Sequence, residues 1–301
     1  MAHIDLHTHS CVSQDGEITP SALVEMAHAN RVTHLAITDH NRVDANRDAL
    51  RKGKNLGVAV IPGIEIDCQY REAHLHILGY FIDYENERYR RLWREHAAAK
   101  AGNNEKRIRA VQALGFHFDE DALRATMRDG ILASVNIADA ILTDPRNNDN
   151  PNLADFRPGG AKSRNPLVDF CWTYVTKGRP AHVEDANPPL SEAIDIIRAT
   201  GGLPVLAHPG SSMPDHEEYL PEILAMGVAG VEVYCGYHSP ETAAKWHALA
   251  RANNAPITCG SDFHGRAKPS IAIGVHGGDA HERESMDTLL REAAGLIAHA
   301  K

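Results

Sequence analysis

The segment at residues 4–16, IDLHTHSCVSQDG, restricts the fold more than any other part of the chain. An apolar run ends in a His-Thr-His triplet, and Asp15 follows after a short polar stretch. If the run is a strand, His7 and His9 point to the same side, because side chains at i and i+2 share a face. Two converging imidazoles can hold a divalent metal ion, although an isolated His-x-His is more often a pair of half-buried strand histidines.

Four later apolar runs also end in residue types that bind metals, and this repetition favours the metal interpretation. The candidate ligands are His7, His9, Asp15, His40, Glu65, His76, His208, Asp262 and His264. Helical patterns separate most of these runs, and this strand–helix order predicts a parallel βα barrel or an open α/β sheet. Active sites of such folds form at the carboxyl ends of strands, so we expect the candidates to meet at one edge.

The strand–helix order stops near residue 84 and returns after residue 180. We expect a barrel domain at residues 1–83 and 181–301, and a mostly helical insertion at residues 84–180. The insertion includes a stretch rich in Asn, Pro and Gly at residues 143–166, which predicts a long loop. Two interpretations of the insertion stay open, a lid over the site or a passive packing subdomain.

The bulk properties predict a globular protein of the cytoplasm. The chain has 301 residues, enough for one large α/β domain with an insertion. Its formal net charge of -9 argues against an extended nucleic-acid-binding surface. The five cysteines form no CxxC pair, as expected for free thiols in a reducing cytosol. We find no signal peptide and no apolar run near the roughly 20 residues that a membrane span needs.

The candidate ligands are too numerous for a single ion with an open position, and they suit two or three ions. A mixture of imidazoles and carboxylates favours Mn, Zn or Fe over Ca. A carboxylate such as Glu65 can bridge two ions, and closely spaced ions can share a hydroxide that attacks phosphorus. The positive charge of the ions would exceed the negative charge of the carboxylates Asp15, Glu65 and Asp262. The excess positive charge would attract an anionic phosphate ester.

Six motifs together resemble the PHP (polymerase and histidinol phosphatase) family of metal-dependent phosphoesterases. They are HTHS with Asp15-Gly16, TDH at residues 38–40, GIE at 63–65, HILGY at 76–80, AHPG at 207–210 and GSDFH at 260–264. They span most of the chain in family order. The resemblance implies an α/β fold, a distorted (β/α)7-type barrel with a helical insertion, and three metal ions.

The resemblance also implies how the ligands are shared among the ions. One ion would take His7, His9, Glu65 and Asp262; the second would take Glu65, His76 and His208; the third would take Asp15, His40 and His264. Asp39 would brace a ligand or assist proton transfer, and it is our candidate catalytic residue.

Two departures from the family pattern bear on the site, the first on the candidate ligand Asp15 and the second on the substrate. Gln14 separates Ser13 from Asp15, where some relatives have Ser-Asp-Gly. Ser134 is followed by Val and Asn instead of the Arg and His that nucleotide-type relatives often carry, which weakens a bisphosphate assignment. The candidate substrate-binding residues are His238, Ser134, Asn136, Lys177 and Arg179, with His182 beside the last two.

We expect a phosphatase that hydrolyses a nucleotide or another small phosphate monoester through a metal-bridging hydroxide. A phosphodiesterase acting on small or cyclic phosphates is the close alternative. An amidohydrolase-type C–N hydrolase is a further alternative, although it would not need Asp15, His40 and His264. A non-catalytic metal or nucleotide sensor is the last. The expected partner is a small phosphorylated substrate, with no membrane and no long nucleic acid.

Overall fold

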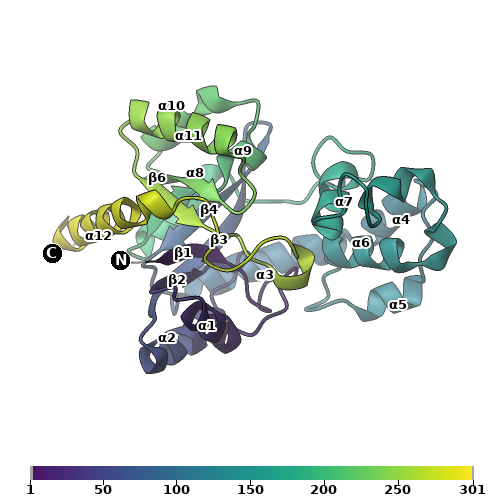
Figure 1. Cartoon of the computed structure of the whole chain (residues 1–301), viewed down its shortest axis with the longest axis horizontal. Coiled ribbons are helices and arrows are strands. Elements are labelled where there is room, and N and C mark those ends of the chain that lie inside the picture. The colour runs from purple at the N-terminus through teal and green to yellow at the C-terminus, as the bar shows by residue number, and fades with distance from the viewer. Residues whose placement is uncertain (1–2, 300–301) are drawn as a thin grey trace.

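The computed structural model describes residues 3–299, and its centre is a seven-stranded sheet whose strand order follows the chain (Figure 1). The strands are β1 (Ile4–Thr8), β2 (His34–Ile37), β3 (Ala59–Tyr70), β4 (Ala73–Tyr80), β5 (Leu203–Leu206), β6 (Gly230–Cys235) and β7 (Ile257–Gly260). The chain just after β7 returns to β1, where the Asp262 N–H donates to the carbonyl of His7 at 2.8 Å and the His9 N–H donates to the carbonyl of Phe263 at 2.9 Å. The sheet is therefore a nearly closed barrel, as the sequence predicted.

Helices cover the outside of the barrel. They are α1 (Pro20–Ala29), α2 (Ala45–Leu56), α8 (Leu190–Ala199), α9 (Pro209–Ser212), α10 (Leu220–Ala225), α11 (Pro240–Ala252) and α12 (Glu282–His299). Two of them start as the sequence predicts, because Thr19 and Ser239 accept backbone N–H bonds as N-caps and a proline follows each. Helix α2 stops at Gly57, whose φ of 73° favours glycine.

Strand β4 differs from the expected parallel order, because it runs antiparallel to both β3 and β5. Only Arg71 and Glu72 separate β3 from β4, which is too short for a parallel crossover, so the chain folds back as a hairpin. Arg71 takes a left-handed φ of 51° in this turn. The reversal puts His76 near the start of β4, opposite Asp67 of β3.

Residues between β4 and β5 form helices, and those within residues 104–174 lie to the right of the barrel in Figure 1. The helices before α8 are α3 (Glu87–Gly102), α4 (Asn104–Gln112), α5 (Glu120–Ala125), α6 (Ser134–Thr143) and α7 (Pro166–Tyr174). The stretch expected to be a loop contains two short 3-10 helices, Pro145–Asn147 and Pro151–Phe156. We propose that residues 84–180 are a unit of their own, since Ile108, Ile137 and Phe170 belong to a separate buried core.

The barrel is packed by three buried apolar clusters, to which every strand contributes side chains. Met286 and Leu289 of α12 belong to one of these clusters. Within residues 3–299, no helix has both the length and the apolar character needed to cross a membrane.

Candidate metal centre

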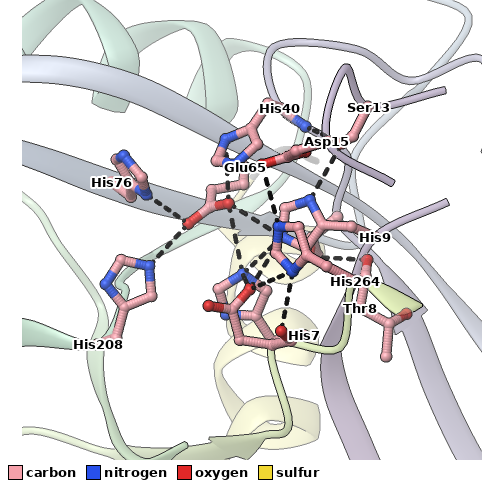
Figure 2. Close-up of polar contacts among 12 residues, drawn as sticks. His7, Thr8, His9, Ser13, Asp15, His40, Glu65, His76, His208 and His264 are labelled. Atoms are coloured by element: carbon pink, nitrogen blue, oxygen red, sulfur yellow. Dashed lines mark hydrogen bonds and ion pairs between the residues drawn. The ribbon is translucent and has the colours of Figure 1, made fainter. Parts of the chain in front are cut away.

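The nine candidate ligands lie together at one end of the barrel (Figure 2). Their donor atoms form overlapping groups: His7 with His9 and Asp262, His7 with Glu65 and His208, His9 with Asp15, His40 and His264, and His40 with Asp67 and His76. Because the groups share members, they make one connected cluster. Asp15 comes from the loop after β1, and most of the others come from strands or the residues just after them.

Four donor atoms surround one point: Nε2 of His7, Nε2 of His9, Oε2 of Glu65 and Oδ1 of Asp262. The two imidazole nitrogens are 3.1 Å apart. Each of them lies 3.2–3.4 Å from the Glu65 oxygen and from the Asp262 oxygen. Ligands about 2.0–2.1 Å from a common tetrahedral ion are roughly 3.3 Å apart, so the spacing of these atoms suits one metal ion.

The Glu65 carboxylate lies between two donor sets. Its Oε1 is 2.9 Å from Nδ1 of His76 and 3.0 Å from Nε2 of His208. Its Oε2 faces the set described above, and it is also 3.2 Å from Nδ1 of His40. One carboxylate with its two oxygens directed at separate groups of imidazoles has the geometry of a bridging ligand.

A third set forms where the loop after β1 meets the residues after β7. Asp15 Oδ2 lies 3.3 Å from Nε2 of His264 and 3.6 Å from Nε2 of His40. His40 also has Nδ1 3.0 Å from Oδ1 of Asp67, a residue that the sequence analysis missed. Asp67 had a detectable signal, because it follows Glu65 at i+2 and therefore shares its strand face.

The residues present fit metal ions. Four buried carboxylate oxygens make no hydrogen bond to any described residue: Asp15 Oδ1, Glu65 Oε2, Asp67 Oδ1 and Asp262 Oδ1. The nearest imidazole nitrogens lie 3.2 Å from Glu65 Oε2, 3.0 Å from Asp67 Oδ1 and 3.2 Å from Asp262 Oδ1. Buried carboxylates need positive charge beside them, and these oxygens and imidazoles lie in one cluster that suits several metal ions.

Charge around the cluster favours ionised carboxylates. Burial alone would lower the pKa of His40, but three neighbouring carboxylates, led by Glu65, raise it to about 10. Burial would raise the pKa of Glu65, but the imidazoles around it hold that pKa well below its ordinary value. Burial and the positive charge of His9 lower the pKa of His264 to about 4. The carboxylates are therefore negative at neutral pH, as metal binding requires.

The Asp39 carboxylate is directed at the loop after β1. It accepts hydrogen bonds of 2.7 Å from both the N–H and the hydroxyl of Ser10, and one of 3.2 Å from the N–H of Ser13. Ser13 in turn lies 3.0 Å from Nδ1 of His9 and accepts the N–H of His40 at 2.9 Å. These contacts hold Asp39 against the loop that leads to Asp15, and its part in proton transfer stays a prediction.

Two further residues that sequence reasoning missed hold the ligands. Glu232 of β6 is fully buried and lies 3.0 Å from Nδ1 of His7. The Lys268 ammonium contacts Oδ2 of Asp262, which leaves Oδ1 for the centre. Asp262 itself has a φ of 56°, a strained value for a residue other than glycine and of the kind that collects at functional sites.

The predicted substrate-binding residues do not lie together. Asn136 lines a cavity of about 300 Å³ beside Asp15 and His264, and Ser134 opens the same helix. Lys177 and Arg179 are exposed on the loop after α7, and neither lines that cavity.

His238, the remaining substrate-binding candidate, donates from Nδ1 to the carbonyl of Val233 at 2.8 Å. Its Nε2 is buried against Gly210, where an added Cβ would lie 2.8 Å from that nitrogen. The ring is therefore held within the protein, and its contact with phosphate stays a prediction.

The nearly closed barrel, the shared cluster of imidazoles and carboxylates, and the match to the PHP domain together identify a metal-dependent phosphoesterase. Residues 5–139 match the PHP domain profile, and the chain belongs to the PHP domain family of metal-dependent phosphoesterases. This finding confirms the resemblance drawn from the six motifs.

Curated relatives cover most of the chain. This chain is 27% identical over 294 residues to the 3',5'-nucleoside bisphosphate phosphatase of Chromobacterium violaceum. The matched region covers 97% of this chain and 95% of that protein. Identity to the 5'-3' exoribonuclease Rnm of Escherichia coli is 29%, covering 90% of this chain and 87% of the other. Identity to the phosphoribosyl 1,2-cyclic phosphate 1,2-diphosphodiesterase of Eggerthella lenta is 28%, and the match covers 87% of this chain and 94% of the other.

Two solved structures share the fold. A protein from Chromobacterium violaceum described as an amidohydrolase has a TM-score of 0.75 and 23% identity, over 91% of this chain and 90% of the other. A putative metal-dependent phosphoesterase from Bifidobacterium adolescentis also has a TM-score of 0.75, with 22% identity over 96% of each chain. At these identities the likeness establishes the PHP fold alone, a nearly closed seven-strand α/β barrel.

Proposed function

We propose that the protein is a phosphatase that releases phosphate from a nucleotide or another small phosphate monoester. The observation that carries the proposal is the position of Glu65, whose two carboxylate oxygens face separate sets of imidazoles. A carboxylate in that position suits neighbouring metal ions, and neighbouring ions suit an in-line attack on phosphorus.

The cluster would hold two or three divalent transition-metal ions, Mn, Zn or Fe. One ion would take His7, His9, Glu65 and Asp262; a second would take Glu65, His76 and His208; a third would take Asp15, His40 and His264. When bound, the ions supply activated water and positive charge for the phosphoryl oxygens.

The chain's own residues orient these groups. Glu232 holds the His7 ring, and Asp39 holds the loop that leads to Asp15. Lys268 fixes one oxygen of Asp262 and adds a buried positive charge beside the cluster. An anionic ester would therefore meet positive charge from both the ions and the ammonium group, in a chain that is acidic overall.

An aromatic pair next to the cluster supports a nucleotide as substrate. Trp172 of α7 is 39% exposed, and its ring centroid lies 5.6 Å from that of Tyr237. Tyr237 in turn lies 5.9 Å from the ring of His208. Exposed aromatic rings are surfaces on which bases stack, so a nucleobase could rest against Trp172 while its phosphate reaches the cluster.

The relatives' names point to phosphate esters of nucleosides or sugars. The names of the three curated relatives describe action on a nucleoside bisphosphate, on RNA and on a cyclic sugar phosphate. A bisphosphate is a weaker choice for this chain, because Val135 and Asn136 supply no cation after Ser134.

A phosphodiesterase is the second candidate, because two of the three named relatives cleave phosphodiesters. The C–N hydrolase and the non-catalytic sensor rank below it. Amide hydrolysis has no need for Asp15, His40 and His264, yet these three residues lie together. We also propose that the protein works in the cytoplasm, since its five cysteines are free thiols and four of them are buried.

The test is hydrolysis of two substrate panels by chelated protein reloaded with Mn, Zn or Fe, followed as inorganic phosphate released from monoesters and as the monoester product formed from diesters. One panel holds nucleoside monophosphates and glycerol phosphate, and the other holds 2',3'-cyclic nucleotides and a linear dinucleotide. We expect metal-dependent release from the monoesters, strongly reduced in Glu65→Gln and unchanged in Glu222→Gln, an exposed control. Turnover of diesters alone would reject the monoesterase, and binding without turnover in any metal would favour the sensor.

A further inference from the structure

Arg128 joins the helical insertion to the loop that carries Asp15. The Arg128 side chain donates to four backbone carbonyls of that loop: those of Cys11 at 2.8 Å, Ser13 at 2.8 Å, Gly16 at 3.2 Å, and Gln14. A guanidinium group has five N–H donors in a fixed planar fork, so it can hold several carbonyls at once. The four acceptors lie on both sides of Asp15 in the chain.

The loop is shaped so that these carbonyls converge. The N–H of Cys11 donates to the carbonyl of Ile18 at 2.7 Å, which closes the base of the loop. Gly16 approaches the carbonyl of Ser10 so closely that an added Cβ would lie 2.0 Å from its oxygen. A folded-back loop of this kind collects several carbonyl dipoles in one place, and a cation there satisfies them together.

Arg128 itself is held rigidly. It pairs with Ile131 through two backbone hydrogen bonds, of 2.9 and 3.2 Å, across a tight turn. Asn104 of α4 donates to the carbonyl of Gly130 in that turn at 2.7 Å, and Arg42 of the barrel bonds Asp129 at 2.7 Å. The backbone turn that carries Arg128 is therefore held by both the insertion and the barrel.

Other contacts also tie the insertion to the barrel, and one of them comes from Arg266, which in addition reaches Glu17 of this loop. Arg266 pairs with Asp139 of α6 at 3.1 Å, and the N–H of Ser270 donates to the side chain of Asn165 at 3.0 Å. Attachment of the insertion alone therefore does not require Arg128. Its four acceptors lie instead on both sides of Asp15, whose loop follows β1.

We propose that Arg128 is a positioning residue for the metal ion that Asp15, His40 and His264 would share. It would act by fixing the backbone on either side of Asp15, so that the carboxylate stays 3.3 Å from His264 Nε2 (Figure 2). The proposal rests on the proposed function through that third ion. It assigns the insertion a part in building the centre.

The experiment measures bound metal per chain, independently of turnover. Chelated protein is dialysed against a limiting concentration of Mn, and its metal content is then determined by mass spectrometry. We expect Arg128→Ala to weaken the least tightly held ion about 10–100-fold, as loss of an outer partner does elsewhere. Asp15→Ala should lose the same ion, and Arg128→Ala combined with Asp15→Ala should lose no more than Asp15→Ala alone.

The control is Arg124→Ala, which removes an arginine that pairs with Glu105 and Glu120 inside the insertion. It should keep the full metal content, as should the wild-type chain. Arg128→Lys keeps the charge without the planar fork, so we expect it to restore binding in part. If Arg128→Ala does not fold, as judged by circular dichroism, Arg128→Lys alone and with Asp15→Ala decides the question in the same way.

Full metal content in the Arg128 variants would overturn the proposal, and so would equal weakening of every ion. If Asp15→Ala left the metal content unchanged, the third ion itself would be wrongly assigned, and the role of Arg128 would fall with it. If the Arg128 variants lose one ion as expected but the metal-loaded wild-type chain hydrolyses no phosphate ester, the proposed phosphatase activity is rejected and the role of Arg128 is kept.

Discussion

Glu232 binds His7 with both carboxylate oxygens, which lie 3.0 and 3.1 Å from the Nδ1 of the ring. This pairing keeps a proton on Nδ1 and leaves Nε2 free to face His9 and Glu65 in the cluster. Glu232 also accepts a hydrogen bond from the backbone N–H of His208 at 3.0 Å, so one carboxylate contacts two candidate ligands. Its position on β6 brings it to the cluster from the opposite end of the chain.

Glu232→Gln should weaken metal binding while the chain stays folded. The amide is a poorer acceptor than the carboxylate and cannot supply the negative charge that favours the His7 tautomer. We expect the dissociation constant for Mn to rise about 10–100-fold, measured by calorimetric titration of the metal-free protein. Glu222→Gln, an exposed change of the same kind on α10, should leave it unaltered. An unchanged constant in Glu232→Gln would show that His7 is oriented without Glu232.

Lys268→Met should destabilise the metal-free chain more than the metal-loaded one. Both partners of the Lys268–Asp262 pair are buried, and breaking such a pair costs about 3–5 kcal/mol of unfolding free energy. Bound ions replace the lost positive charge next to Asp262, so the cost should shrink on metal addition. Urea unfolding with and without Mn measures both, and Lys245→Met provides an exposed control. Equal losses in the two states would contradict this expectation.

Trp172→Ala should raise KM for nucleotides and leave KM for glycerol phosphate unchanged. A base stacked on an aromatic ring gains about 1–3 kcal/mol, or roughly a 5–150-fold change in affinity. Glycerol phosphate has no base to stack, so it serves as the control within the same variant. Steady-state kinetics on both substrates measures the difference. A parallel rise for both would mean that the ring supports the fold and makes no contact with a base.

Metal binding should release protons at pH 7. Burial lowers the pKa of His40, but neighbouring carboxylates raise it to about 10, so the metal-free ring is protonated and must lose its proton to bind an ion. Calorimetric titrations in buffers of different ionisation enthalpy count the released protons. Apparent metal affinity should rise with pH until His40 loses its proton unaided near pH 10. Buffer-independent heats at pH 7 would contradict this.

The same pKa shift sets a sign for stability. A pKa raised on folding from the ordinary 6.5 stabilises the metal-free fold fully below pH 6.5. That contribution disappears as pH rises through about 10. The contribution of His264 to stability has the opposite sign. Burial lowers its pKa to about 4, so the folded state loses stability relative to the unfolded chain as the pH falls below the ordinary 6.5.

The sequence predicted nine side chains that the structure brings together, because each one had a local signal. His7 and His9 share a strand face through their spacing, and His208 and Asp262 follow short apolar runs. Local signals fail where the partner is remote in the chain. Glu232 lies 225 positions from His7, and nothing in its own strand distinguishes it from an ordinary buried acid.

The direction of β4 escaped prediction for a different reason. Arg71 and Glu72 form the turn without the Gly or Asn that usually marks a two-residue hairpin. The short spacing between the two runs was nevertheless sufficient to exclude a parallel crossover. Asp67 shares the strand face of Glu65, and this i+2 spacing is the signal from which it could have been predicted.

The barrel seam has a consequence for the order of events during synthesis. Backbone bonds between His7 and Asp262, and between His9 and Phe263, close the seam with the residues that carry the donors. A ribosome must therefore release nearly the whole polypeptide before the first histidines meet their last partners. Cations would be captured late in the life of a nascent chain, and partial products would carry the ligands without the centre.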